Sequence, residues 1–207
     1  MGLAGLPAAV AQLLSAGMPP DTPAAMVQHG TTAAQRAVVS TLAALPRDVE
    51  QAGLGPPALF IIGPTVDHAK RLDWAQRLPL AGERLLVASA ASGLAGPLES
   101  EGAEVISVSL PVTPAARVVI GALPLTGCVV GTPEEVGALD RETGSAGWRA
   151  DVAAWCLTRD TARRARELGW ERVEEVEANA GGSSLLQRIG RLRDSNPRPS
   201  REGGGSC

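Results

Sequence analysis

Short apolar segments of helix length and strand length alternate along the first part of the chain. Apolar residues recur at helical spacing over residues 5–16, where Pro7 falls in the first turn, which tolerates proline. A second, shorter helix is predicted at residues 46–53, with Gly53 ending it. Apolar runs predict strands at residues 23–28 and 57–63, and a segment rich in β-branched residues predicts a third at residues 36–42.

A regular alternation of strands and helices begins at residue 83. Strands are predicted at residues 83–89, 104–108, 126–131, 152–157 and 172–176. Helices are predicted at residues 93–101, 133–139, 160–168 and 183–192. This alternation is typical of an α/β fold with a mainly parallel sheet.

Pro79 and Gly82 separate these two patterns. We therefore expect one domain at residues 1–78 and a second, small α/β domain at residues 79–192. Residues 193–207 are rich in Pro, Gly and Ser and nearly devoid of apolar residues, which is typical of a disordered tail.

Composition narrows the class of protein. Of the 207 residues, 44% are hydrophobic and 20% charged, as in globular domains, and the net charge is −3. Nucleic-acid binding usually needs a basic face and stacking aromatics, and only 2% of residues are aromatic. The three cysteines have no C-x-x-C spacing, so neither a zinc site nor a disulfide framework is expected.

Targeting and membrane segments are not predicted. No run of 18 apolar residues occurs, and no cationic stretch precedes the first apolar segment. We therefore expect a cytoplasmic protein without a membrane partner.

The turn after residues 23–28 is the first candidate binding site. Gly30 allows backbone to approach a ligand, and Thr31 adds a hydroxyl at the same strand end. In open α/β sheets, ligands sit outside the carboxyl ends of strands. His29 is either a general base or a solvent-facing loop residue, and no carboxylate or cysteine stands at a useful spacing from it.

Thr132 is the second candidate. It precedes Pro133 and stands three residues before Glu135, the pattern of a helix N-cap, although a hydroxyl there is also a possible substrate ligand. Basic residues from 163 to 172 either meet acidic substrate groups or face water on a helix.

Several motifs in the first domain keep their order and spacing as in a known family. Met1-Gly-Leu, Asp21-Thr-Pro-Ala, His29-Gly-Thr-Thr and Pro56-Pro-Ala-Leu-Phe-Ile-Ile-Gly resemble the C-terminal half of the uroporphyrinogen-III C-methyltransferase catalytic domain. The resemblance implies S-adenosylmethionine as cofactor, with Met1, Gly30 and the neighbouring Thr31 contacting it. The family's methionine is internal, so the resemblance also implies a chain that begins inside a domain. The family continues from Gly63 into Glu-Val-Val, where this chain has Pro-Thr-Val.

Residues 80–192 resemble a shortened uroporphyrinogen-III synthase. Leu80-Ala-Gly-Glu-Arg-Leu-Leu-Val matches that family's opening strand, and Val129-Val-Gly-Thr matches a later strand end, where the resemblance implies substrate contact by Thr132. The synthase family has two lobes, while these residues suffice for about one. Thr158 stands where a glycine is usual, and the chain has no Tyr.

The two resemblances together imply a truncated piece of a methyltransferase/synthase fusion of siroheme or cobalamin biosynthesis. The implied reaction is S-adenosylmethionine-dependent methylation of uroporphyrinogen III to precorrin-2. The alternatives are synthase activity on hydroxymethylbilane, or a non-catalytic remnant that binds a partner or a tetrapyrrole. The methyltransferase family is usually dimeric, so a homodimer is expected for an intact protein.

Overall fold

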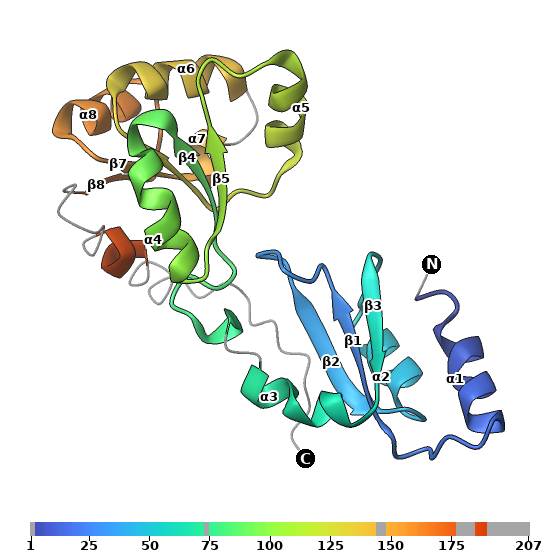
Figure 1. The fold of residues 1–207 in the computed structure, drawn as a ribbon. Helices are drawn as coiled ribbons and strands as arrows, with labels where there is room; N and C mark the ends of the chain where they lie inside the picture. The colour runs from blue at the N-terminus through green and yellow to red at the C-terminus, as the bar shows by residue number, and fades with distance from the viewer. Residues whose placement is uncertain (1–2, 73–74, 144–147, 177–184, 190–207) are drawn as a thin grey trace. The chain divides into compact units, whose positions relative to one another are not determined.

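The structure is a computed structural model that describes residues 3–72, 75–143, 148–176 and 185–189. The chain divides into two compact units, with the boundary between Arg77 and Leu78 (Figure 1). Met1 and the tail predicted at residues 193–207 lie outside the described residues. Of the helix predicted at residues 183–192, the structure describes residues 185–189, and these are helical.

The first unit contains the two helices and three strands that the sequence predicts, each within two residues of its expected bounds. Its elements are α1 (Leu6–Ser15), β1 (Pro23–Gln28), β2 (Arg36–Thr41), α2 (Leu45–Gln51) and β3 (Ala58–Ile62), followed by the short helices η1 (Pro64–His68), α3 (Ala69–Leu72) and η2 (Ala75–Arg77).

The strands of the first unit form an antiparallel sheet in the order β2-β1-β3. Val27 in β1 pairs with Ala37 in β2 and with Leu59 in β3, and both ladders run antiparallel. The expectation that the end of β1 lies at the carboxyl edge of an open α/β sheet is therefore wrong. That rule concerns parallel sheets, whereas here the turn after β1 is the tip of a hairpin.

Helices α1 and α2 contribute to a core on one face of this sheet. Leu6 and Val10 of α1 and Leu45 and Val49 of α2 are buried with Met26 of β1. In Figure 1, α2 lies behind the strands. A buried leucine or valine side chain contributes about 1.5–3 kcal/mol relative to an exposed one, so these contacts are the main stabilisation of the unit.

The second unit is an α/β domain around a five-stranded sheet. Its strands are β4 (Arg84–Ala88), β5 (Glu104–Val108), β6 (Gly127–Val130), β7 (Ala153–Cys156) and β8 (Val173–Glu175). The order is β5-β4-β6-β7-β8, and every pairing is parallel, which confirms the predicted parallel sheet. Its helices are η3 (Ser89–Leu94), α4 (Ala95–Ser100), α5 (Pro114–Ala122), α6 (Pro133–Thr143), α7 (Trp148–Asp151) and α8 (Arg159–Glu167). Neither α5 nor α7 was predicted from the sequence.

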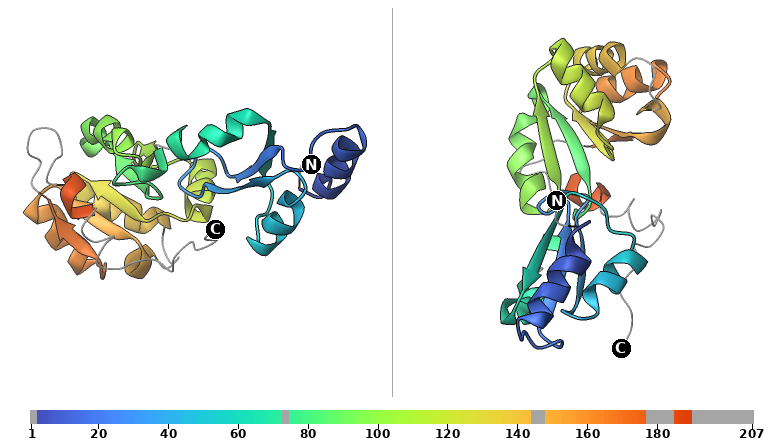
Figure 2. Two further views of the ribbon diagram at one scale, coloured as in Figure 1. Left: turned by 90° about the horizontal axis from the view of Figure 1, so that it is seen from below. Right: turned by 90° about the vertical axis from the view of Figure 1, so that its right-hand side faces the viewer.

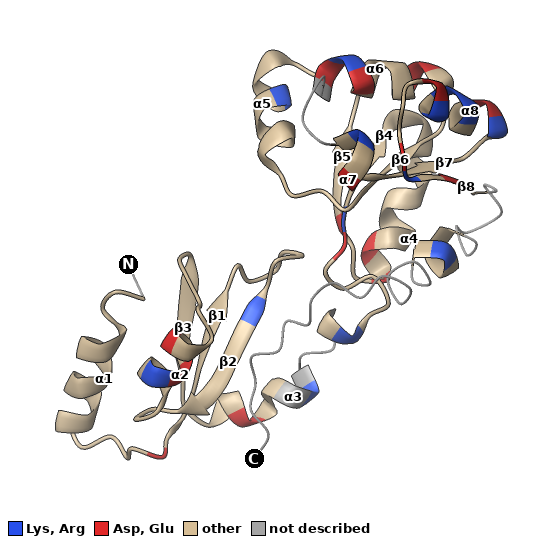
Figure 3. Cartoon of the chain, turned by 180° about the vertical axis from the view of Figure 1, so that it is seen from behind, with Lys and Arg blue, Asp and Glu red and all other residues tan. Residues whose placement is uncertain are grey.

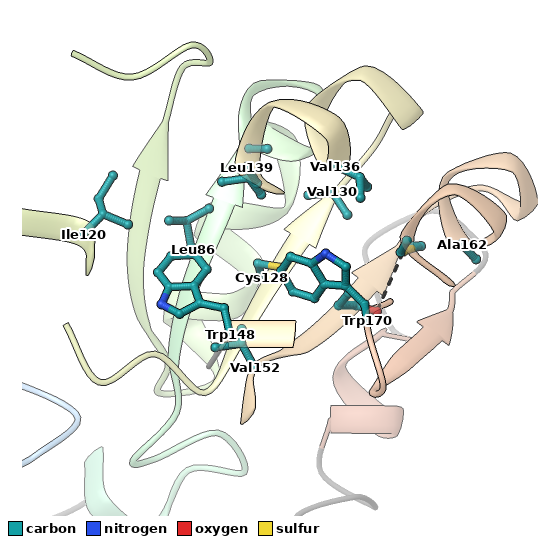
Figure 4. Close-up of a cluster of buried hydrophobic side chains, with 14 residues drawn as sticks. Leu86, Ile120, Cys128, Val130, Val136, Leu139, Trp148, Val152, Ala162 and Trp170 are labelled. Carbon is teal, nitrogen blue, oxygen red and sulfur yellow. Dashed lines mark hydrogen bonds between the residues drawn. The ribbon is translucent and has the colours of Figure 1, made fainter. Parts of the chain in front are cut away.

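Helices cover both faces of the five-stranded sheet (Figure 2). One core includes side chains from α5, α6, α7 and α8, and Cys128 of β6 lies in it among Trp148 and Trp170 (Figure 4). The other core includes Leu98 of α4 and Leu185. Strands covered on both faces read as continuous apolar runs, and this holds for β4, β6 and β7, which are buried at every position.

Candidate functional site

The turn between β1 and β2 has an unusual backbone. His29 has φ 48° and Thr31 has φ 68°, so both residues flanking Gly30 are left-handed. This region costs an L-residue roughly 1–2 kcal/mol, and a β-branched residue such as Thr31 is rarely found there. Such strain is retained only where the surroundings fix it, and it concentrates at binding and catalytic sites.

Hydrogen bonds hold this turn in its strained form. The side-chain oxygen of Gln35 accepts a bond of 2.7 Å from the Thr31 N–H. The Thr32 hydroxyl donates to the His29 carbonyl oxygen at 2.9 Å, and the His29 N–H donates to the Pro57 carbonyl oxygen at 3.1 Å. The turn is thereby attached to the start of β3, and Gln35 locks it from within.

The fold itself does not require glycine at position 30. A Cβ there would lie 3.6 Å from Val27 Cγ1 and 3.9 Å from Gln35 Oε1, which are ordinary contacts, and Gly30 is not among the glycines with positive φ. The structure therefore gives no internal reason for the missing side chain. Met1, the other residue expected at the cofactor, lies outside the described residues.

A hollow of about 540 Å³ lies between α1 and α2. Its lining is mostly apolar and includes Leu3, Leu6 and Leu54, with Arg47 and Glu50 as its charged members. It contains no residue of the turn at positions 29–35. The hollow is therefore separate from the turn.

Residues of the hairpin and of α2 are fixed by charged groups. The Arg36 guanidinium donates to the Ala52 carbonyl oxygen at the end of α2, at 2.6 Å. The Ser40 hydroxyl donates to Asp48 Oδ2 at 2.5 Å, and this bond, together with bonding from Arg47, lowers the pKa of Asp48. Arg36 and Ser40 thereby connect the hairpin to α2 and its C-terminal end.

In the second unit, the strand order reverses between β4 and β6, which is where ligands bind in open parallel sheets. Here one carboxylate spans that position. Glu135 Oε1 accepts from the Ala90 N–H at 2.7 Å, and Glu135 Oε2 accepts from the Gly131 N–H at 2.8 Å. A Cβ on Gly131 would lie 2.6 Å from Ala90 Cβ, so only glycine fits there. The protein's own carboxylate thus accepts from two backbone amides at the point where the strand order reverses.

Thr132 caps α6 in this arrangement. Its hydroxyl accepts from the Glu135 N–H at 3.3 Å, as expected of an N-cap. The expected return bond of a capping box is replaced, because the Glu135 carboxylate reaches the Gly131 N–H instead. In the first turn of α8, the Thr161 hydroxyl donates to the Gly131 carbonyl oxygen at 3.0 Å, and Thr158 caps this helix.

The arginines of α8 are engaged within the unit. Arg163 forms ion pairs with Asp160 and Glu167, and Arg164 pairs with Glu167. Arg166 and Arg172 donate to backbone carbonyl oxygens. This pattern favours the interpretation of a solvated, internally paired helix face over that of a site for acidic substrate groups.

The two described cysteines are poor nucleophiles. Burial raises the pKa of Cys128 far above its usual range, and burial raises the pKa of Cys156 to about 12. Because the thiolate is the reactive form, neither is suited to covalent catalysis. In the part of the chain that the structure describes, no three His, Cys, Asp or Glu residues gather as a metal site. Among the same residues, no helix is long and apolar enough to cross a membrane.

Two residues of these arrangements were not predicted as site residues. Gln35 accepts a hydrogen bond from the Thr31 N–H in the strained turn, and Glu135 accepts one from the Ala90 N–H after β4. No structural role was predicted for Gln35, and Glu135 was predicted only as part of a helix cap. Their contacts depend on how the turns fold, which residue spacing does not reveal.

Comparisons with known proteins give a partial match. No family model matches the chain. It is 47% identical over 74 residues to siroheme synthase of Methylococcus capsulatus, covering 36% of this chain and 16% of that protein. It is 45% identical over 97 residues to siroheme synthase of Thiobacillus denitrificans, covering 47% of this chain and 19% of that protein. The chain therefore spans less than a fifth of the length of these relatives.

One structural neighbour is distant. The crystal structure of an orphan response regulator of H. pylori aligns with 52% of this chain and 92% of its own, at 15% identity and a TM-score of 0.32. A TM-score this low carries no argument about fold or function. The similarity that stands is in sequence, where 36 to 47% of this chain matches part of siroheme synthase.

Proposed function

We propose that the first unit is part of an S-adenosylmethionine-dependent uroporphyrinogen-III methyltransferase, and that the turn at residues 29–35 forms one wall of its cofactor pocket. The observation that carries this proposal is the left-handed pair His29 and Thr31 around Gly30. The exposed turn is strained at His29 and Thr31, and packing within the fold does not require glycine at position 30. A ligand that approaches the Gly30 backbone closely supplies the missing reason for both features.

The length of the sequence match supports the same assignment. Several matches to siroheme synthase span 74 residues, close to the length of the unit that ends at Arg77. We assign the similarity to this unit because the motifs at residues 1–78 that resemble the methyltransferase lie there.

The proposed role of this unit in the reaction is to position the cofactor. When bound, S-adenosylmethionine supplies a methyl group on a sulfonium centre, and the acceptor would be a carbon of uroporphyrinogen III. Alignment of the two reacting groups accounts for most of the acceleration in such a transfer. The backbone around Gly30 and Thr31 would hold the cofactor, with Gln35 keeping the Thr31 peptide in place. None of the side chains of the turn is assigned as a base.

For the second unit, a non-catalytic role is the second candidate, in preference to synthase activity. The observation that favours it is the Glu135 carboxylate on the Ala90 and Gly131 amides, since those are the groups that a ligand at the crevice would use. In an intact protein this unit would support the tetrapyrrole enzyme structurally, and self-association into a homodimer is part of the proposal.

Titration calorimetry of the full chain with S-adenosylhomocysteine tests the cofactor site. We expect a micromolar Kd, about −8 kcal/mol, for the wild-type chain. Gly30→Trp should abolish binding, because the indole would fill the space at the turn. Gly93→Trp is the matched control, since a Cβ at Gly93 meets no atom within 4 Å.

Each outcome has a defined meaning. Loss of binding in Gly30→Trp with retention in Gly93→Trp supports the proposal, provided that circular dichroism shows both variants folded. A folded wild-type chain that takes up no S-adenosylhomocysteine refutes it. Equal binding by wild type and Gly30→Trp places the ligand elsewhere and also refutes it.

A further inference from the structure

The outer face of α5 in the second unit carries exposed apolar side chains. Val118 is 74% exposed and Val119 is 60% exposed. Residues three and four positions apart share one face of a helix, so these valines lie on the same side as two exposed alanines, Ala115 and Ala122. Another side of the helix packs into the core of its own unit through the buried Ile120 (Figure 4). The outer face therefore contributes little to the packing of this unit.

Charge on this helix is compensated within the chain. Arg117 is the one charged residue of α5, and its guanidinium forms an ion pair with the Glu142 carboxylate of α6. Figure 3 shows α5 with a single basic position and otherwise without charged ones. Adjacent exposed apolar side chains mark a binding surface, whereas isolated ones are normal on any protein. A second copy of this face would meet no uncompensated like charge, which is the condition for two identical surfaces to associate.

The order of the residues on this face is symmetric along the helix. The face reads Ala-x-x-Val-Val-x-x-Ala from Ala115 to Ala122, so the pattern is the same in both directions. In a twofold interface the same patch serves both partners and must be complementary to itself. A twofold axis between Val118 and Val119 would bring each Val118 onto the Val119 of the second copy, and each Ala115 onto its Ala122. The face therefore meets the condition for pairing with its own copy in an antiparallel arrangement.

The size of the face sets the strength of this contact. The nine residues of α5 form a helix about 14 Å long and, with side chains, about 10–12 Å wide. Such a face is much smaller than the roughly 800 Å² that each partner buries in a stable complex. Pairing through α5 is therefore weak and reversible, and the dimer fraction rises with protein concentration.

We propose that two copies of the chain associate by antiparallel pairing of their α5 helices, with Val118 and Val119 at the centre of the contact. This inference rests on the homodimer that is part of the proposed function, and it adds the surface through which the homodimer forms. The cofactor site is not needed for it, because all residues of the contact belong to the second unit.

Sedimentation equilibrium of the full chain over a wide range of concentrations tests the pairing. Wild type should shift from monomer toward dimer as concentration rises. Val118→Glu should weaken dimerisation about tenfold or more, because two carboxylates without partners would be buried in the contact. Leu59→Glu is the matched control, since Leu59 is a 64% exposed apolar residue of β3 in the first unit, and it should leave dimerisation unchanged.

A double variant tests the antiparallel arrangement. In Val118→Glu/Val119→Lys, the proposed pairing places each glutamate opposite the lysine of the second copy. Dimerisation should therefore recover in part relative to Val118→Glu, and the recovery should fall as salt is added, since exposed ion pairs are weak and screened. Circular dichroism of each variant checks that the chain is folded.

The outcomes separate this inference from the cofactor site. Loss of dimerisation in Val118→Glu with salt-sensitive recovery in the double variant supports it. A folded wild-type chain that stays monomeric at every concentration overturns it, as does equal dimerisation of wild type and Val118→Glu. Loss in Leu59→Glu alone places the contact on the first unit, and loss in Val118→Glu without recovery excludes the antiparallel arrangement, so both also overturn it. In all of these cases, binding of S-adenosylhomocysteine measured separately still decides the cofactor site.

Discussion

Replacing Glu135 by Ala should destabilise the second unit more than its partial exposure suggests. The change removes two acceptors at once and leaves the Ala90 and Gly131 N–H groups without their partner, at original distances of 2.7 and 2.8 Å. A hydrogen bond to a charged group contributes about 1.5–3 kcal/mol. Because the site is partly exposed, we use a value below that range for each bond and expect a total loss of about 2 kcal/mol.

The neighbouring Glu134 provides the control. Both acids lie in the first turn of α6, where a negative charge stabilises the helix by about 0.3–1 kcal/mol. Glu134→Ala removes only that effect, so the difference between the two variants isolates the bridge. Glu135→Gln should fall between them, because its amide oxygen can accept from one N–H while its NH₂ group faces the other.

Urea denaturation followed by tryptophan fluorescence is the suitable assay. Trp148, Trp155 and Trp170 are all buried in the second unit and report on its unfolding. With a urea slope of about 1–3 kcal/mol per molar, the midpoint should fall by roughly 1 M for Glu135→Ala. If Glu135→Ala lowers the midpoint no more than Glu134→Ala does, the bridge does not stabilise the strand ends and the reasoning is refuted.

Two further predictions concern the first unit. Thr31→Gly should raise the urea midpoint seen by circular dichroism, because relief of left-handed strain, about 1–2 kcal/mol, exceeds the added backbone entropy of glycine, about 0.5–1 kcal/mol; a lower midpoint would mean that the Thr31 side chain stabilises the turn. Asp48 has a pKa lowered chiefly by the Ser40 hydroxyl, so its stabilisation is complete above its unfolded pKa of about 3.9 and is lost as pH falls through the folded pKa. Unfolding measured from pH 6 to pH 3 should therefore show a steeper loss of stability in wild type than in Asp48→Asn, and identical slopes would contradict the assigned cause.

Most helices and strands could be predicted because the apolar runs and turn residues that mark them lie within the elements themselves or next to them in the sequence. The central strands β4, β6 and β7 are buried at every position, so each stands out as an apolar run between turns. Helix α5 was missed because Arg117-Val-Val-Ile resembles a strand, and because Val118 and Val119 are exposed in the structure, which disrupts the expected amphipathic pattern. The Thr113-Pro114 pair at its start was the capping signal available in the sequence.

Contacts between segments that are far apart in the sequence could not be predicted from the local pattern of residues. The antiparallel pairing of β1 with both neighbours is set by hairpin geometry and by long-range contacts. The bridge from Glu135 to Ala90 joins residues 45 positions apart. The turn after β1 lies where the sequence predicts a turn, but the left-handed backbone of His29 and Thr31 was not predicted from their residue types.

Strands β1, β2 and β3, in which Arg36 is the one charged residue, also affect how the chain behaves in solution. An outer strand offers unpaired backbone groups to other molecules, and natural proteins usually discourage such pairing with charges or prolines placed on that strand. Strand β8, at one margin of the larger sheet, has Glu174 and Glu175 in this role, whereas β3, at a margin of the smaller sheet, consists of Ala-Leu-Phe-Ile-Ile. We therefore expect aggregation at high protein concentration to begin at the smaller sheet and not at the larger one.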